Sequence, residues 1–267
     1  MVQELGRRAR NRLERHGAFL RAAKTIAFAE GLDALTMQRL ADEVDAAVGT
    51  VYTYFPSKSA LVAELQREAI QVLDDSCARF EARFERDLVP TERSLTRRRL
   101  ALVVGYTRFW VDTLETFPEE ARLLQLLMSE RRSTVDDQDV SRVVPAAVRI
   151  LERVRLALDA AVADGALNPG DGMERTVVLA ASLNGVLLLD HVARVDPALF
   201  DGPRLARTLV TDLLRGWGAE QADLAAAWRR VDALAERGPL ATRAATVPPS
   251  TDPTPTDPTP IRPEEVS

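Results

Sequence analysis

The sequence is poor in the residues from which most catalytic and metal sites are built. Its 267 residues include one cysteine, Cys77, and two histidines, His16 and His191, which lie far apart in the chain. A single cysteine excludes an internal disulfide, and two separated histidines exclude a Cys/His metal cluster. The glycine motifs GxxxxGK[ST], GxGxxG and GxSxG do not occur either. These absences argue against most familiar enzymes, and we expect neither a cofactor nor a metal.

Long apolar segments are also missing. The longest stretch without a charged residue runs from Thr176 to Leu189 and contains Ser182 and Asn184, whereas a bilayer-spanning helix needs about 20 predominantly apolar residues. The N-terminus carries charges where a secretory signal needs an apolar stretch. We therefore expect no membrane contact and a location in the reducing cytoplasm. Cys77 falls on the apolar stripe of a predicted helix and is interpreted as a core residue rather than a reactive thiol.

The charge is unevenly distributed along the chain. The net charge is −5, with 35 lysines and arginines against 40 aspartates and glutamates, yet residues 1–24 hold seven basic residues against two acidic ones. A basic arm on an acidic protein can supply the phosphate contacts that drive DNA binding. The alternative is a frayed, solvated N-terminus. On the first interpretation, the arm contacts DNA through Arg7, Arg8, Arg10 and Arg12.

Apolar residues recur at three- and four-residue spacing nearly throughout the chain. This periodicity predicts an all-α protein of about nine or ten helices and no sheet. Besides the short helices described next, helices are expected at about 12–30, 57–88, 92–116, 118–131, 140–164, 171–194, 203–217 and 219–236. Pro145 implies either a kink in its helix or a later start of that helix. Asp171 and Glu174 have the spacing of a capping box at a helix N-terminus.

Residues 36–58 carry the most informative pattern. Thr36 is the predicted N-cap of a short helix whose inner face is Leu40, Ala41 and Val44. A tight turn follows at 45–47, and a second short helix ends before Pro56, because the residue before a proline is pushed out of the α region. Two short helices across a three-residue turn form a helix-turn-helix, whose second helix lies in the DNA major groove.

This stretch resembles the TetR family of one-component transcriptional regulators. The family pattern Gly-Val-x-x-x-x-Leu-Tyr-x-Tyr/His-Phe-x-x-Lys-x-x-Leu appears here as Asp45-Ala46-Ala47-Val48-Gly49-Thr50-Val51-Tyr52-Thr53-Tyr54-Phe55-Pro56-Ser57-Lys58-Ser59-Ala60-Leu61. The upstream segments Phe28-Ala29-Glu30-Gly31 and Leu35-Thr36 also match, and the resemblance covers about residues 12–65. Two positions depart from the pattern: Asp45 replaces the usual turn glycine, and Ala47 replaces a frequent Ser/Thr cap. Because aspartate tolerates a left-handed backbone, we expect the turn to survive.

The resemblance implies a set of DNA contacts by position. Val48 and Gly49 have no side-chain hydrogen-bonding group for a base edge, so base reading depends on Gln38, Arg39, Thr50 or contact with thymine methyl groups. The predicted DNA-binding residues of this segment are Thr36, Met37, Gln38, Arg39, Ala47, Val48, Gly49, Thr50, Tyr52, Tyr54 and Lys58.

A helix-turn-helix module usually acts as a dimer on palindromic half-sites, because one module buries too little surface for tight binding. The predicted helix at 174–194 is apolar on almost every side, and the helix at 203–217 carries a leucine stripe. The two resemble the helix pair through which this family dimerises; the alternative for the first is a wholly internal core helix. The predicted homodimer interface comprises Val178, Leu183, Leu187, Leu205, Leu209, Leu213 and Trp217.

The middle helices resemble the ligand-binding domain of the family. Asn184 and His191 are polar groups within an apolar stretch, and they either orient a ligand or hydrogen-bond within the dimer seam. No excess of buried cations is visible, which favours a hydrophobic effector that is neutral or weakly acidic. The predicted ligand-binding residues are Tyr106, Phe109, Trp110, Phe117, Leu127, Met128, Asn184 and His191, and Leu124 and Leu151 are further candidates for the cavity lining.

The sequence therefore predicts three segments. Residues 1–58 form the helix-turn-helix domain with its basic arm, residues 59–238 form a helical effector-binding and dimerisation domain, and residues 239–267 form a disordered Pro/Thr-rich tail. The predicted function is a repressor that binds double-stranded DNA as a dimer and is released by a small hydrophobic effector. The alternative is a DNA-binding regulator whose large domain engages a protein partner. A helical enzyme is disfavoured, because Asp190 and His191, its one available acid–base pair, diverge on a helix.

Overall fold

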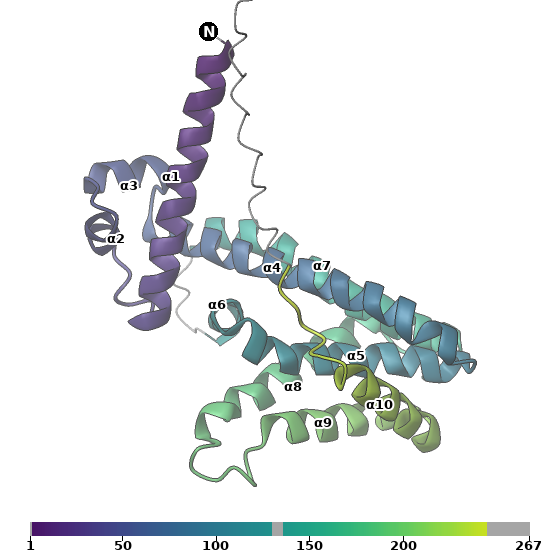
Figure 1. Ribbon diagram of the computed structural model, residues 1–267. Helices are drawn as coiled ribbons and strands as arrows, with labels where there is room; N and C mark the ends of the chain where they lie inside the picture. Colours follow the sequence, from purple (N-terminus) through teal and green to yellow (C-terminus); the bar gives the residue numbers. More distant parts are fainter. Residues whose placement is uncertain (1, 130–135, 245–267) are drawn as a thin grey trace, which may run out of the picture.

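The computed structural model describes residues 2–129 and 136–244, and within these ranges it leaves out the side chains of residues 2–5, 126–129, 137, 190 and 191. In the described ranges the chain forms ten α-helices, two short 3-10 helices and no strand (Figure 1). The predicted all-α fold is therefore confirmed.

The N-terminal part consists of α1 (Val2–Ala29), α2 (Met37–Glu43) and α3 (Val48–Tyr54). Phe19 of α1, Leu40 of α2 and Val51 of α3 are fully buried and form the centre of its core. Helix α1 begins about ten residues before the predicted start, so the basic segment is a helix and not a frayed terminus. Arginine and glutamate are good helix formers and no proline interrupts the segment, which explains the longer helix.

Helix α4 (Lys58–Asp87) connects this part to the larger domain, and Ser57 caps it by accepting a hydrogen bond from the amide of Ala60 at 3.0 Å. A 3-10 turn at Val89–Thr91 leads into α5 (Leu95–Thr116), α6 (Pro118–Ser129) and α7 (Asp137–Ala163). Helix α7 packs along α4, as Figure 1 shows. Pro145 lies inside α7, so the later helix start that the proline allowed is excluded.

The larger domain is completed by α8 (Gly172–Leu187), α9 (Gly202–Gly216) and α10 (Gln221–Ala235). Asp171 accepts a hydrogen bond from the amide of Glu174 at 2.8 Å, which confirms the predicted cap of α8. The α-helix ends earlier than the predicted position 194, because the chain tightens into the 3-10 helix η2 (Leu188–Val192). Gly185 lowers helix propensity just before this change.

The segment after α10 corrects one predicted boundary. Residues 237–244, here called the C-terminal strap, cross α5 and α4 (Figure 1), and Leu240 and Ala241 are buried. The amide of Leu240 donates to Asp112 Oδ2 at 2.6 Å, and the amide of Thr242 donates to Ser76 Oγ at 3.0 Å. The tail therefore does not start at residue 239, since apolar burial and buried hydrogen bonds hold the strap. Residues 245–267 of the predicted tail lie outside the described residues.

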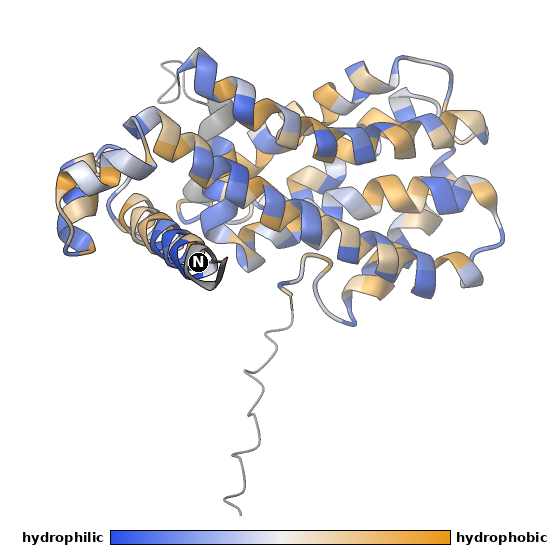
Figure 2. Cartoon of the chain, turned by 90° about the horizontal axis from the view of Figure 1, so that it is seen from above, coloured by the Kyte–Doolittle hydropathy of each residue, from blue (hydrophilic) through white to orange (hydrophobic). Residues whose placement is uncertain are grey.

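The larger domain buries most of its apolar residues between helices, and Figure 2 shows the alternation of hydrophobic and hydrophilic residues along them. Cys77 is 1% exposed on α4, in agreement with the predicted core position, and burial raises the pKa of its thiol. In the part of the chain that the structure describes, every helix is too short or too polar to cross a membrane.

Candidate DNA-binding surface and effector pocket

The turn between α2 and α3 accommodates both departures from the family pattern. Asp45 adopts a left-handed backbone with φ of +50°, which aspartate tolerates better than most residues. Thr36 caps α2 by accepting from the amide of Arg39 at 3.0 Å, as predicted. Ala47 precedes α3 without a side-chain cap bond. The helix-turn-helix thus forms with one unconventional turn residue and one missing cap.

Helix α3 buries one side and presents the other to solvent. Val51 is buried, and so is Phe55, the residue after α3, whose ring lies 5.0 Å from the His16 ring of α1 between centroids. The predicted DNA-binding residues Ala47, Gly49 and Tyr52 are exposed, and Val48, Thr50 and Tyr54 are half-buried. This outward side has the shape and small side chains that allow a helix to approach base edges closely.

Three predicted contacts around α2, Thr36, Gln38 and Arg39, already have partners within the protein. Thr36 and Gln38 are exposed, and Gln38 Nε2 donates to Asp42 Oδ1 at 2.8 Å. Arg39 forms ion pairs with Glu43 at 2.7 Å and Glu30 at 3.1 Å.

Burial corrects one predicted DNA contact, Met37, and a second predicted contact, Lys58, has a hydrogen-bond partner within the protein. Met37 is only 6% exposed, because the first residue of α2 faces the core, so its side chain is no DNA contact in this conformation. Lys58 is half-buried and donates to the backbone oxygen of Leu32 at 2.6 Å. Its ammonium group therefore helps to hold the loop before α2.

The predicted basic arm lies on the N-terminal half of α1. Arg7, Arg8, Arg10 and Arg12 are all exposed. The guanidinium carbon of Arg12 is 5.9 Å from the ring centroid of Tyr54, the last residue of α3. The structure therefore brings the arm and the second helix of the motif side by side.

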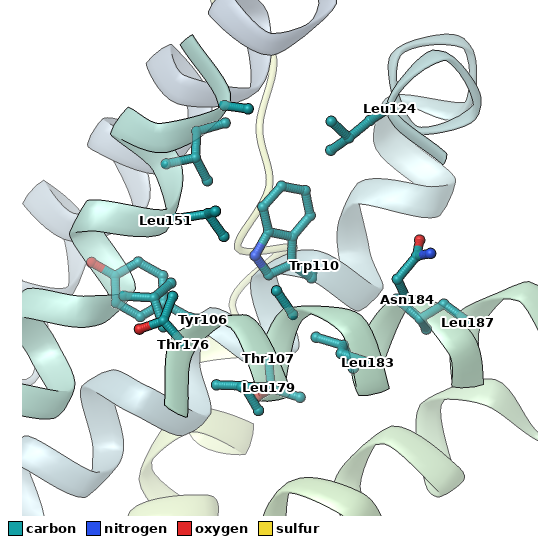
Figure 3. A pocket seen from close by; sticks show the side chains of 14 residues that line it. Tyr106, Thr107, Trp110, Leu124, Leu151, Thr176, Leu179, Leu183, Asn184 and Leu187 are labelled. Atoms are coloured by element: carbon teal, nitrogen blue, oxygen red, sulfur yellow. The ribbon is translucent and has the colours of Figure 1, made fainter. Parts of the chain in front are cut away.

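A pocket of about 230 Å³ lies between α5, α6, α7 and α8 (Figure 3). Three predicted ligand-binding residues, Tyr106, Trp110 and Asn184, line it, and Figure 3 shows the Trp110 indole inside it with Asn184 on the α8 side. Among the described residues, the lining contains no charged side chain. The full lining is Tyr106, Thr107, Trp110, Leu124, Ala147, Ile150, Leu151, Val154, Thr176, Leu179, Ala180, Leu183, Asn184 and Leu187.

Other predicted ligand-binding residues lie elsewhere. Phe109 and Phe117 are 0% exposed and do not line the pocket: Phe109 stacks on Phe80 at 5.8 Å between ring centroids, and Arg243 of the strap lies 4.6 Å from the Phe117 ring. These two are corrected to core residues. The side chains of Leu127, Met128 and His191 lie outside the described part of the chain.

The sequence-based prediction named one α7 residue, Leu151, as a candidate for the cavity lining and missed its neighbours on that helix. Ala147, Ile150, Leu151 and Val154 recur at three- and four-residue spacing on the side of α7 that faces α5 and α8. The same spacing is typical of ordinary core residues. The periodicity identifies the buried side of α7, but it does not indicate that a cavity lies next to this side.

The lining residue Tyr106 belongs to a polar network that joins α5 to α4 and α7. The Tyr106 hydroxyl donates to Glu81 Oε1 at 2.6 Å, and Arg153 binds Glu81 Oε2 at 2.5 Å and Asp74 Oδ1 at 2.8 Å. Burial raises the pKa of Tyr106, and the hydrogen bond to Glu81 raises it further. Tyr106 therefore stays neutral, and its ring on α5 is linked to α4 and α7.

Two predicted interface residues on α8 face inward. Leu183 and Leu187 are 5% and 7% exposed and line the pocket, so they are corrected to interior residues of one protomer. Val178, on another side of α8, is 41% exposed. The predicted α9 residues Leu205, Leu209, Leu213 and Trp217 are half-buried.

Polar contacts between α1 and α6 join the N-terminal part to the larger domain. Lys24 of α1 lies 2.5 Å from Glu120 Oε1 and 3.1 Å from Glu119 Oε2 on α6. Arg122 Nη1 of α6 donates to the backbone oxygen of Phe28 at the end of α1 at 3.1 Å. Burial lowers the pKa of Lys24, but hydrogen bonds to Glu120 and Glu119 outweigh it and the pKa is raised. The ammonium group therefore stays charged at this junction.

Comparison with known proteins gives a match for the N-terminal part. Residues 19–65 match the bacterial regulatory proteins of the tetR family. The chain is 47% identical over 66 residues to the HTH-type transcriptional repressor KstR of Mycobacterium tuberculosis, a match that spans 24% of this chain and 29% of that protein.

Two solved structures share the fold over most of the chain. One is RolR in complex with resorcinol, with a TM-score of 0.51, 17% identity, and coverage of 84% of this chain and 95% of that one. The other is SmeT, the repressor of the Stenotrophomonas maltophilia multidrug efflux pump SmeDEF, with a TM-score of 0.50, 19% identity, and coverage of 78% and 92%.

The matched segment coincides with the helix-turn-helix that the structure forms at α2 and α3. The sequence similarity to the bacterial regulatory proteins of the tetR family therefore covers the helix-turn-helix segment, residues 19–65.

Proposed function

We propose that this protein is a repressor that binds a palindromic operator as a homodimer and that a small, hydrophobic, uncharged effector releases it from DNA. The effector proposal depends on the pocket of about 230 Å³ with apolar walls. Helix α6, which lines the pocket, contacts α1, and helix α4, which binds the lining residue Tyr106, continues from the motif. The similarity to KstR, named a repressor, supports the direction of regulation over the N-terminal segment. Binding to chromosomal DNA places the protein in the cytoplasm.

The proposed operator contacts follow from the exposed side of the motif. Helix α3 enters the major groove with Gly49, Thr50 and Tyr52 toward the DNA, and the amide groups at the start of α2 bind a phosphate. Gln38 and Arg39 are held by Asp42, Glu43 and Glu30 in the free protein. Both side chains must exchange these partners for DNA, which lowers the affinity gained from each contact.

The proposed homodimer uses the solvent-exposed apolar side of α8. Val177 is 50% exposed and Val178 41%, and Met173 and Leu188 extend the same surface. Contiguous exposed apolar residues of this kind mark a protein interface. Because a two-fold interface pairs the same patch on both subunits, one helix can cover its copy in a second chain. Val178→Glu should therefore give a monomer by light scattering and abolish tight operator binding.

The proposed effector is defined by the chemistry of the pocket. An engineered cavity of about 150 Å³ binds benzene, so about 230 Å³ accommodates a molecule of one or two rings. Tyr106 and Trp110 offer ring faces, and the Asn184 amide can accept or donate one hydrogen bond. RolR, which shares the fold, was solved with resorcinol, a small phenol. An anionic effector is disfavoured, because the described part of the lining has no cation and Glu81 is the hydrogen-bond partner of Tyr106.

The proposed signal travels along two routes. Leu124 of α6 lines the pocket, and Glu119 and Glu120 of the same helix hold Lys24 of α1. Tyr106 lines the pocket and is hydrogen-bonded to Glu81 of α4, the helix that continues from the motif. An effector that displaces α6 or α4 changes the position of the two motifs in the dimer. A coupling of about 1 to 3 kcal/mol between the sites suffices for release.

Two measurements test this proposal. Selection of genomic fragments with the purified protein should recover an inverted repeat, and its absence at low salt would contradict operator binding. A thermal-shift screen should then find stabilising compounds among neutral aromatic molecules, which also release the recovered DNA. If no small molecule stabilises the protein, the larger domain acts instead through a protein partner.

A further inference from the structure

We infer that the N-terminal half of α1 is a second DNA-binding element, in which Arg8, Arg12 and Arg15 bind phosphates beside the base pairs contacted by α3. These three residues are called the arginine stripe. The inference rests on the proposed operator binding and deepens it, because it assigns a role to a helix that lies outside the helix-turn-helix motif.

The first argument is the register of α1. Phe19, Ala23 and Ile26 are at most 2% exposed and belong to the buried core. Arg15, Arg12 and Arg8 continue the same series toward the N-terminus at three- and four-residue spacing, so they lie on the same side of the helix. At about 100° per residue, Arg7 and Arg10 fall on the opposite side. The structure therefore separates the four predicted arm arginines into two faces.

The second argument is the proximity of this face to α3. Arg12 lies 5.9 Å from the Tyr54 ring centroid, and the Phe19 and Tyr54 rings are 5.2 Å apart. Figure 1 shows the N-terminal turns of α1 projecting past α2 and α3. The arginine stripe thus begins at the C-terminal end of α3 and runs on beyond the motif.

The third argument is charge. Arg12 and Arg15 are exposed and, among the described residues, form no ion pair with an acidic side chain. By contrast, Arg39 and Lys24 are held by glutamates. A protein of net charge −5 needs a local positive surface to attract DNA. The arginine stripe supplies cations on the side where α3 is exposed.

The length of the stripe indicates which phosphates it reaches. The helix rises about 1.5 Å per residue, so Arg8 lies about 10 Å from Arg15 along α1. One strand of DNA carries a phosphate about every 3.4 Å along the axis. The stripe is therefore about as long as three base-pair steps, and it reaches phosphates beside the base pairs that α3 covers. Such contacts add affinity without reading sequence.

The test compares two double variants that remove the same charge. Arg8→Gln with Arg12→Gln removes part of the stripe, and Arg7→Gln with Arg10→Gln removes two arginines from the opposite face. Each phosphate contact contributes about 0.9 to the slope of log affinity against log salt. We expect the stripe variant to lower the slope by about 1.8 per protomer, and the opposite-face variant by less than half of that. Hydroxyl-radical footprinting should lose protection only at the outer edges of the operator in the stripe variant.

Two further measurements keep the outcomes distinct. Arg12→Lys retains the charge near Tyr54 and should keep most of the salt slope, and circular dichroism melting of all variants checks that α1 remains folded. Equal slopes for the two double variants would overturn the arginine stripe while leaving operator binding intact. If the wild-type protein itself recovers no specific DNA, the proposed function fails, and with it the inference that rests on it.

Discussion

Replacing Lys24 by methionine should destabilise the protein through the carboxylate that it leaves behind. Glu120 is 2% exposed in its side chain and accepts from Lys24 Nζ at 2.5 Å. Its second oxygen has no hydrogen-bond partner in the described residues, and the nearest other cation, Arg243 of the strap, is 3.6 Å away. Methionine keeps an unbranched side chain that is one atom shorter, and it removes the ammonium group with its charge and donors.

The magnitude follows from the burial of the pair. Removing one partner of a buried ion pair costs about 3 to 5 kcal/mol. Lys24 is 27% exposed and Arg243 can approach the carboxylate. We therefore expect a cost below this range, of about 2 kcal/mol. For a chain of this size, that corresponds to a melting temperature lower by about 4 to 8 °C. Lys24→Met with Glu120→Gln should recover at least about 1 kcal/mol, because the buried charge is gone.

Urea denaturation of the wild type, the two single variants and the double variant gives the coupling free energy. The raised pKa of Lys24 means that its contribution is complete below its unfolded value of 10.5 and is lost as the pH rises through the folded value. The difference between wild type and Lys24→Met should therefore be constant from pH 7 to about 9 and shrink above about pH 10.5. Additive single-variant effects would refute the reasoning, as would a Lys24→Met cost below about 0.5 kcal/mol.

Three further predictions concern other parts of the structure. Truncation after Gly238 should lower the melting temperature, because burying side chains such as Leu240 contributes about 1.5 to 3 kcal/mol, whereas truncation after Ala244 should leave it unchanged; equal melting curves would contradict the packed strap. Asp45→Gly should stabilise the protein by up to about 1 kcal/mol and Asp45→Ala should destabilise it, since a left-handed backbone costs an L-residue about 1 to 2 kcal/mol; denaturant midpoints in the reverse order would refute this. Asn184→Leu should abolish the preference of the pocket for a naphthol over naphthalene in calorimetric titration, and an unchanged preference would remove Asn184 from the proposed effector contacts.

Local chemistry was enough to predict the helix-turn-helix. Its signals are a threonine cap at Thr36, a short turn at Asp45, a buried Val51 and the break before Pro56, and each acts within a few residues. The structure places all four as predicted. Helix existence was predictable for the same reason, since apolar periodicity reports which side of a helix is buried.

The sequence could not predict which buried residues leave a cavity. Phe109 and Trp110 are neighbours of the same chemical type, yet only Trp110 lines the pocket, because adjacent helical residues point about 100° apart and the packing of α7 and α8 decides where space remains. Leu183 and Leu187 were predicted at a subunit interface and lie inside one protomer. A helix that is apolar on nearly every side does not reveal which side its own chain covers.

The sequence by itself determined the helical fold, the motif and the basic charge of the N-terminal segment, because these depend on residue type and on spacing along one helix. Tertiary structure alone decided that Lys24 meets Glu120, that the strap returns to α4 and α5, and that Tyr106 reaches Glu81. Those contacts join residues 25 to 166 positions apart. Their partners are set by how helices pack in three dimensions, which no local pattern records.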